Sequence, residues 1–166
     1  MADNNTIAWP YAQAAFQVAV ETGALGDLSA SLNTAKTLLD DGRVVMERIY
    51  RYTVGRTLLE CPSGGLDGED AETAARRELE EETGYVAAEI RRLGTFYGST
   101  GISNERYHVC LATGLREDGE IRREATEQIE VCLLPLGELR ERAARGELED
   151  GPSAFAILLA ARELDG

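Results

Sequence analysis

The sequence predicts an α+β fold in which a mixed β-sheet is sandwiched between helices, an α/β/α sandwich. Three observations lead to this prediction: short apolar segments bounded by turn residues, one central helix with clear start and stop signals, and two helical segments that close the chain. The chain has 166 residues, of which 43% are hydrophobic, and this length can bury one well-formed core. We therefore expect a single domain over residues 1–166, with 1–30 as a short N-terminal extension.

The expected strands are apolar segments between turns. Residues 16–21 alternate like a strand, although 11–20 could instead form a short helix. The turn sequence Asp40-Asp41-Gly42-Arg43 favours a hairpin over residues 38–52. Further strands are expected over residues 56–61, 86–95, 106–113 and 129–135, and helices over residues 136–145 and 153–164. These elements supply the sheet and the outer helices of the sandwich.

The central helix is expected between Asp70 and Gly84. Asp70 suits the N-cap position, and Gly84 suits the residue that follows the last turn. Before the helix, residues 62–65 and 67–68 are turn formers, so we expect a glycine loop that cannot continue a strand. A strand, a glycine loop and a helix in this order would let the loop backbone approach a metal or a phosphate.

Three carboxylates, Glu78, Glu81 and Glu82, share one side of this helix. At about 100° per residue, Glu82 lies about 40° and Glu81 about −60° from Glu78. The same side carries small and apolar residues, which are Ala71, Ala74, Ala75 and Leu79. Such acidic runs are more often solvated helix surface, but like charges on an inward face call for a cation. Oxygen ligands without His or Cys indicate Mg²⁺, with Mn²⁺ as the alternative.

Composition limits the partners of the protein. The net charge of −13 argues against a nucleic-acid partner, because binding a polyanion needs clustered Lys and Arg. Cys61, Cys110 and Cys132 lack metal-site spacing, and we expect them to be reduced and mostly buried. Neither a basic-then-apolar leader nor a run of about 18 apolar residues is present. We expect a cytoplasmic protein with no membrane partner.

Residues 77–85 fit the pattern R-E-U-x-E-E-x-G-U, where U is apolar or aromatic. This segment resembles the core of the Nudix box, the motif of the Nudix hydrolases. Glu69 stands eight residues before Arg77, as the box requires, although four residues rather than the usual five separate Gly64 from Glu69. The resemblance implies the Nudix fold and metal-dependent hydrolysis of a pyrophosphate bond. It also implies that Glu69 braces the loop and the helix by pairing with Arg77.

The resemblance assigns roles to the carboxylates of the helix. Glu78 and Glu82 are implied to be direct metal ligands. Glu81 is implied to be a ligand or a partner through water, and so belongs to the catalytic carboxylates as well. The backbone carbonyl of Ser63 or Gly64 is the implied further ligand. These assignments predict a Mg²⁺ site between the glycine loop and the helix.

The residue that orients or deprotonates the attacking water is implied to lie on the loop before Ile129. Glu127 is the first choice for this base and Glu124 the second. His108, the one histidine, sits in an apolar segment, and we expect it to be a core residue. Trp9, the one tryptophan, could stack on a base, but packing is the expected role. Acid–base chemistry is therefore expected from carboxylates.

Further segments resemble motifs of the ADP-ribose pyrophosphatase group within that family. They are residues 48–52 and 58–64 (R-Q-Y-R and L-E-L-P-A-G), 98–105 (S-P-G-x-S-x-E), 127–131 (E-x-I-E-V) and 145–150 (G-x-I-x-D). This second resemblance implies hydrolysis of ADP-ribose to AMP and ribose 5-phosphate. It also implies a homodimer, because these enzymes commonly pair through their N-terminal sheets.

Substrate contacts are expected from Arg51, Thr100 and Gly101. A bidentate guanidinium suits a diphosphate, so Arg51 is expected to bind the substrate phosphates, with Glu60 as a supporting carboxylate. Thr100 replaces the proline that usually marks ADP-ribose preference in this group. A nucleotide sugar such as GDP-mannose, or a modified nucleoside triphosphate, is therefore an alternative substrate. A Nudix-like nucleotide-sensing domain is the non-enzyme alternative, which the complete acidic helix disfavours.

Overall fold

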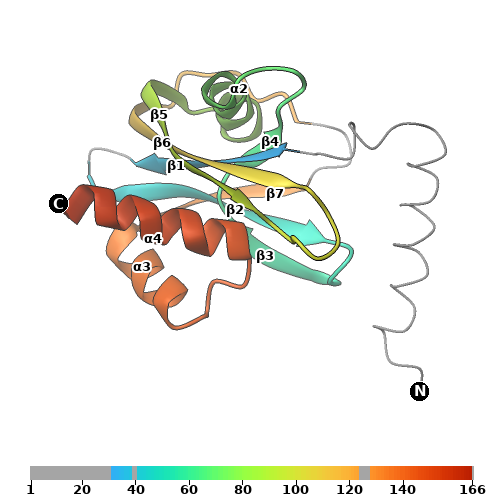
Figure 1. Ribbon diagram of the computed structural model, residues 1–166. Helices are drawn as coiled ribbons and strands as arrows, with labels where there is room; N and C mark the ends of the chain where they lie inside the picture. The colour runs from blue at the N-terminus through green and yellow to red at the C-terminus, as the bar shows by residue number, and fades with distance from the viewer. Residues whose placement is uncertain (1–30, 39–40, 124–127, 166) are drawn as a thin grey trace.

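A computed structural model describes residues 31–38, 41–123 and 128–165 (Figure 1). Among these residues a seven-stranded sheet lies between helix α2 (Ala71–Thr83) on one face and helices α3 (Leu136–Ala144) and α4 (Gly151–Asp165) on the other. This arrangement confirms the predicted α/β/α sandwich. The expected N-terminal extension and the element expected within residues 11–21 lie outside the described residues.

The sheet is mixed, with β1 at its centre. Its strands are β1 (Ser31–Leu38), β2 (Arg43–Arg51), β3 (Arg56–Glu60), β4 (Ser63–Gly65), β5 (Val86–Tyr97), β6 (Arg106–Arg116) and β7 (Ile129–Pro135). Strand β1 runs parallel to β6 along its whole length and antiparallel to β4. Strand β2 pairs antiparallel with both β3 and β7, and β5 pairs antiparallel with β6. Segments distant in the sequence therefore meet around β1 and β2.

Strand β2 has both faces buried, because helices cover the sheet on both sides. Val44 and Val45 are neighbours in the chain and are fully buried in different clusters. Val45 packs with Leu79 of helix α2. Val44 packs with Leu139 of α3 and with Ile157 of α4. The alternation of side chains along the strand thus divides the interior into two layers.

None of the three cysteines is in a disulfide; Cys61 and Cys110 are buried and Cys132 is partly buried, as expected. Phe96 of β5 packs edge-on against Phe155 of α4, with ring centroids 4.4 Å apart.

None of the helices in the described part of the chain is long and apolar enough to cross a membrane.

Two parts of the sheet differ from the sequence prediction. Strand β1 begins at Ser31, ahead of the predicted hairpin arm. Among the described residues it meets β2 at two register pairs, Thr37 with Val45 and Leu38 with Val44. The sequence S-L-N-T-A-K-T-L has a weak strand pattern, and its conformation is set by pairing with β6. The glycine loop was expected not to continue a strand, and β3 does end at Glu60, but Ser63–Gly65 forms a separate short strand, β4, that pairs with β1.

The other boundaries lie close to the prediction. Strand β7 has the predicted bounds, whereas β5 and β6 continue beyond theirs to Tyr97 and Arg116. Helix α4 begins two residues earlier than expected, at Gly151. The fold brings β4, the end of β3 and helix α2 together, and this is the region in which the predicted site lies.

Candidate functional site

Helix α2 presents its predicted inward face to the sheet. The Asp70 side chain caps the first turn by accepting a 2.9 Å hydrogen bond from Thr73 N–H, and Gly84 ends the helix at φ 76° in the left-handed region. On the inward face Leu79 is fully buried and Glu82 is only 5% exposed. The helix therefore carries a nearly buried carboxylate against the sheet, as its helical phase predicts.

The carboxylates of Glu78 and Glu82 both meet the backbone of β4. Ser63 N–H donates a 3.0 Å hydrogen bond to Glu82 Oε2. At the next residue, a Cβ built on Gly64 would overlap the carboxyl group of Glu78. Gly64 is therefore needed for Glu78 to lie this close to the strand. The two carboxylates converge on two consecutive residues of one strand.

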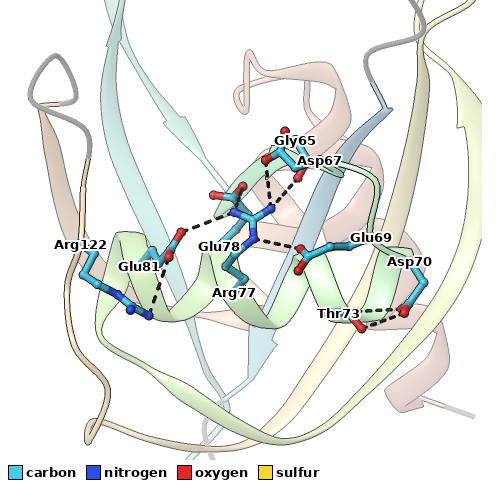
Figure 2. Close-up of polar contacts among 9 residues, drawn as sticks. All are labelled: Gly65, Asp67, Glu69, Asp70, Thr73, Arg77, Glu78, Glu81 and Arg122. Atoms are coloured by element: carbon cyan, nitrogen blue, oxygen red, sulfur yellow. Dashed lines mark hydrogen bonds and ion pairs between the residues drawn. The ribbon is translucent and has the colours of Figure 1, made fainter. Parts of the chain in front are cut away.

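Arg77 joins the strand, the loop and the helix (Figure 2). Its guanidinium donates hydrogen bonds to the carbonyl of Gly65 at 2.9 Å and to the carboxylates of Glu69 and Glu78 at 2.9 and 2.7 Å. Glu81 Oε2 lies 3.4 Å from Arg77 Nη1. The predicted pairing of Glu69 with Arg77 is confirmed. Because a guanidinium holds its donors in a fixed plane, these contacts fix the loop relative to the helix.

Burial and crowding oppose the ionisation of Glu78. Burial is the main cause that raises the pKa of Glu78 above its ordinary value; the Arg77 guanidinium opposes this rise, while Glu81 and Asp67 add to it. Burial also works against the charge on Arg77, but its hydrogen bonds to Glu69 and Glu78 outweigh this effect and raise the pKa of Arg77. A cation placed beside Glu78 would favour the ionised form of its carboxyl group.

The donors of this site suit a hard divalent cation. Carboxylate oxygens and the carbonyls of β4 are ligands that Mg²⁺ and Mn²⁺ accept. Within residues 31–38, 41–123 and 128–165, no three His, Cys, Asp or Glu side chains are already grouped around one ion position. Arg77 instead holds the carboxylate of Glu78, and Ser63 N–H holds that of Glu82. The donor types fit a divalent cation, which would replace these hydrogen-bond donors on binding.

Arg51 is oriented by a buried carboxylate. Glu60 accepts two hydrogen bonds from its guanidinium, at 2.9 Å from Nε and 2.7 Å from Nη2. Glu60 is only 4% exposed, whereas the Arg51 side chain is 44% exposed. Glu60 is the main cause of the raised pKa of Arg51, with smaller contributions from Asp150 and Glu82. Arg51 thus presents a fixed positive charge to solvent within electrostatic range of Glu82.

Glu47 is a further carboxylate in this region that was not predicted from the sequence. It is fully buried on β2 and lies directly opposite Glu60 in the register of β2 and β3. A glutamate inside the apolar run V-V-M-E-R-I is the sequence signal that could have identified it.

Residues 119–123, which we call the strap, lie along the last turn of α2. The final carbonyl groups of a helix have no partner within the helix. The strap supplies donors to them: Gly119 N–H to Gly84 O at 3.0 Å, Arg122 N–H to Glu81 O at 2.9 Å, and Arg123 Nε to Glu82 O at 2.7 Å. These contacts were not predicted from the sequence, although two adjacent arginines in an acidic stretch are a signal that could have identified them.

Thr100 and Gly101 are exposed in the loop between β5 and β6. This loop is closed by a 3.0 Å hydrogen bond from Ile102 N–H to Ser99 O. No hydrogen bond or ion pair within the described residues joins Thr100 or Gly101 to α2. The structure therefore does not bring this part of the predicted site into contact with the carboxylates.

The remaining candidates divide into two groups. Glu124, Glu127 and Trp9 lie outside the described residues. His108 is 8% exposed, and its Nδ1 lies 3.0 Å from Thr95 Oγ1, which is consistent with the core position expected for it.

Comparison with known proteins adds to this geometry. The sequence profile of the NUDIX domain matches residues 34–154. An ADP-ribose pyrophosphatase of Bacillus subtilis (strain 168) is 38% identical over 120 residues, which cover 71% of this chain and 65% of that protein. An ADP-ribose pyrophosphatase of Mycobacterium tuberculosis is 39% identical over 124 residues, covering 72% of this chain and 59% of that protein.

A relative with lower identity is named after a different substrate. A GDP-mannose pyrophosphatase of Salmonella arizonae is 34% identical over 106 residues, covering 60% of this chain and 53% of that protein. The chain thus spans about half to two thirds of the length of the curated relatives described above. A crystal structure of an ADP compounds hydrolase superposes with a TM-score of 0.67 at 21% identity, covering 81% of this chain and 74% of that chain. At this identity the likeness concerns the fold alone.

Proposed function

This chain belongs to the Nudix family, and on that premise we propose that it hydrolyses the pyrophosphate bond of a nucleoside diphosphate linked to another moiety. The proposed substrate is ADP-ribose, and the products are AMP and ribose 5-phosphate. The observation that carries the proposal is the convergence of Glu78 and Glu82 on the backbone of Ser63 and Gly64. The two relatives named ADP-ribose pyrophosphatase support the choice of substrate.

Members of the family typically use a divalent metal, and we propose Mg²⁺, with Mn²⁺ as the alternative. Glu78, Glu82 and the carbonyl of Ser63 would hold it, with Glu81 as a direct ligand or a partner through water. When bound, such an ion neutralises phosphate charge and lowers the pKa of a bound water. Arg77 holds the loop against the helix through its hydrogen bonds to the carbonyl of Gly65 and the carboxylate of Glu69, and so keeps β4 beside α2.

In the proposed reaction, Arg51 binds oxygens of the diphosphate while Glu60 holds its guanidinium in place. Thr100 and Gly101 contact the substrate from the β5–β6 loop. Glu127, or Glu124 in its place, accepts a proton from the attacking water. The oxygen of that water bonds to one phosphorus, the bond from this phosphorus to the bridging oxygen breaks, and two phosphate monoesters leave.

The test is an assay of the purified protein against ADP-ribose, GDP-mannose, other nucleotide sugars and nucleoside triphosphates, with Mg²⁺ and without it. The products are identified by mass, and the reaction in ¹⁸O-labelled water shows which phosphorus is attacked. Release of AMP and ribose 5-phosphate only in the presence of the metal is the expected result. Release of inorganic pyrophosphate from a nucleoside triphosphate would contradict the proposed substrate class.

GDP-mannose is the second candidate substrate. Thr100 stands where the ADP-ribose pyrophosphatase group usually has proline, and a relative at 34% identity is named GDP-mannose pyrophosphatase. A ratio of kcat/KM above one for GDP-mannose over ADP-ribose would favour it. Tight nucleotide binding without turnover of any compound in the panel would instead favour a sensing domain.

The proposal includes a homodimer as the working form. Sedimentation equilibrium should then give twice the chain mass of 18.1 kDa. A mass of 18.1 kDa at assay concentrations would contradict the dimer and leave the proposed chemistry in place.

A further inference from the structure

Two hydrogen bonds hold the main chain of the strap at Arg122 and Arg123 against helix α2. The N–H of Arg122 donates a 2.9 Å hydrogen bond to the carbonyl of Glu81, and the next residue, Arg123, is anchored to the carbonyl of Glu82. The Cα of Arg122 therefore keeps a constant position beside the last turn of α2, the turn that carries two of the proposed metal ligands.

The two adjacent arginines of the strap are used differently. The guanidinium of Arg123 donates hydrogen bonds to two carbonyls, those of Glu82 and Ile129, at 2.7 and 2.9 Å, and is held in place by them. The Arg122 side chain is 54% exposed, and its Nη2 lies 3.7 Å from Glu81 Oε1, beyond hydrogen-bond distance. Figure 2 shows Arg122 reaching Glu81 from the side opposite to Arg77. Arg122 can therefore turn away from Glu81 without breaking a short hydrogen bond.

Releasing Glu81 should cost little. An exposed ion pair of this length contributes little to stability, and the other oxygen of Glu81 lies 3.4 Å from Arg77. The neighbouring cations are less free to move, because Arg77 is held by Glu69 and Glu78, and Arg51 is held by Glu60. Arg122 therefore places a cation beside α2 with a fixed main chain and a guanidinium that can move.

We propose that Arg122 binds a non-bridging phosphate oxygen of the diphosphate, exchanging Glu81 for the substrate. This inference rests on the proposed function. A protein with a net charge of −13 repels an anionic substrate, so a guanidinium at the rim of the site contributes both attraction and a charge-assisted hydrogen bond. The role concerns binding, and Arg122 takes no part in the proton transfer.

The test compares the wild type with Arg122→Gln, Arg122→Lys and the matched control Arg91→Gln. Arg91 is 56% exposed and pairs with Glu163 of α4 at 3.1 Å, so the control removes the same charge on the other side of the sheet. For each protein, kcat and KM for ADP-ribose are measured with saturating Mg²⁺. The Kd of ADP in Mg²⁺ is measured by calorimetry, and Tm reports the fold.

Arg122→Gln should raise both KM and the Kd of ADP by about tenfold, with kcat changed by less than about threefold. Arg122→Lys should recover part of this loss, because it keeps the charge without the planar fork. Arg91→Gln should behave as the wild type. The difference between the wild type and Arg122→Gln should shrink as the salt concentration rises.

Equal KM and Kd values for Arg122→Gln and Arg91→Gln would overturn the inference. If the wild type hydrolyses ADP-ribose in the same experiment, the proposed function still stands. If the wild type turns over no compound in the panel, the proposed function fails, and the Kd of ADP still decides the role of Arg122. A wild type that binds no ADP overturns the inference as well.

Discussion

The carboxyl group of Glu78 occupies the space in which a side chain at Gly64 would lie. Strand β4 and helix α2 can therefore approach each other only because residue 64 has no Cβ. The backbone of Gly64 lies in strand β4, outside the left-handed region, so the demand for glycine is one of space. This contact makes Gly64 and Glu78 a single geometric unit.

Gly64→Ala should move Glu78 and lower kcat/KM by about a hundredfold, because small displacements of positioned groups have effects of this size. Gly65→Ala is the matched control. The atoms nearest to a Cβ at Gly65 would be those of the Asp67 side chain, from 3.3 Å, and this variant should retain most of the activity. Steady-state kinetics gives kcat/KM for both variants, and Tm checks that each is folded. Comparable activity in the two variants would show that the position of Glu78 is not critical.

Glu82→Gln should lower kcat by about 10²- to 10³-fold, because it removes a charge from a site that depends on electrostatic stabilisation. The amide can still accept the hydrogen bond from Ser63 N–H, so Tm should change by only a few degrees. Glu80→Gln on the same helix is the control, since Glu80 points to the strap and accepts from Glu120 N–H. Near-normal Mg²⁺-dependent turnover by Glu82→Gln would refute its assignment as a ligand.

Glu127→Gln should slow the chemical step by about 10²- to 10⁴-fold, the usual contribution of a general base, while KM stays close to that of the wild type. Pre-steady-state product formation measures this step directly. Glu124→Gln is the comparison variant and should be nearly unaffected. If the two variants exchange these behaviours, the base is Glu124.

The stability of the fold should depend on His108 at acidic pH. Burial is the main cause that lowers the pKa of His108 below its ordinary value, with Arg92 and Arg106 adding to it. The unfolded chain therefore binds the proton more readily, and His108 makes stability fall as the pH drops through 6.5. The loss cannot exceed about 1.4 kcal/mol per pH unit for one group.

His108→Asn, which can keep a hydrogen bond to Thr95, should remove this part of the pH dependence. The measurement is the difference in unfolding free energy between the two proteins, from urea titrations at pH 7 and pH 5. The carboxylates titrate in both proteins and cancel in the difference. A difference that is the same at both pH values would contradict a buried neutral imidazole.

The elements that could be predicted from the sequence are those defined by local signals. The caps at Asp70 and Gly84 and the helical phase of α2 depend on neighbouring residues, and the structure has them as expected. Strand β4 depends instead on pairing with β1, and β1 depends on pairing with β6, and local patterns carry little of that information. The inward face of Glu82 was therefore predictable, whereas the strand at Ser63–Gly65 was not.

The site divides in the same way. The pairing of Glu69 with Arg77 follows from a motif within one short segment, and it was predicted. The contacts of Arg122 and Arg123 with the carbonyls of Glu81 and Glu82 join residues about forty positions apart. These contacts donate hydrogen bonds to carbonyl groups at the end of a helix, which have no partner within the helix, and any hydrogen-bond donor can supply such a bond. For that reason the sequence alone does not say which residues supply it.

The two interior layers of the sandwich share no residue among their buried members, although Val44 and Val45 are adjacent. Laboratory evolution for heat resistance could therefore randomise the layer beneath α3 and α4 while the residues beneath α2 stay fixed. Libraries built in this way should yield proteins with a higher Tm and unaltered substrate preference. Libraries aimed at new substrates would leave the α3 and α4 layer alone and keep its contribution to folding.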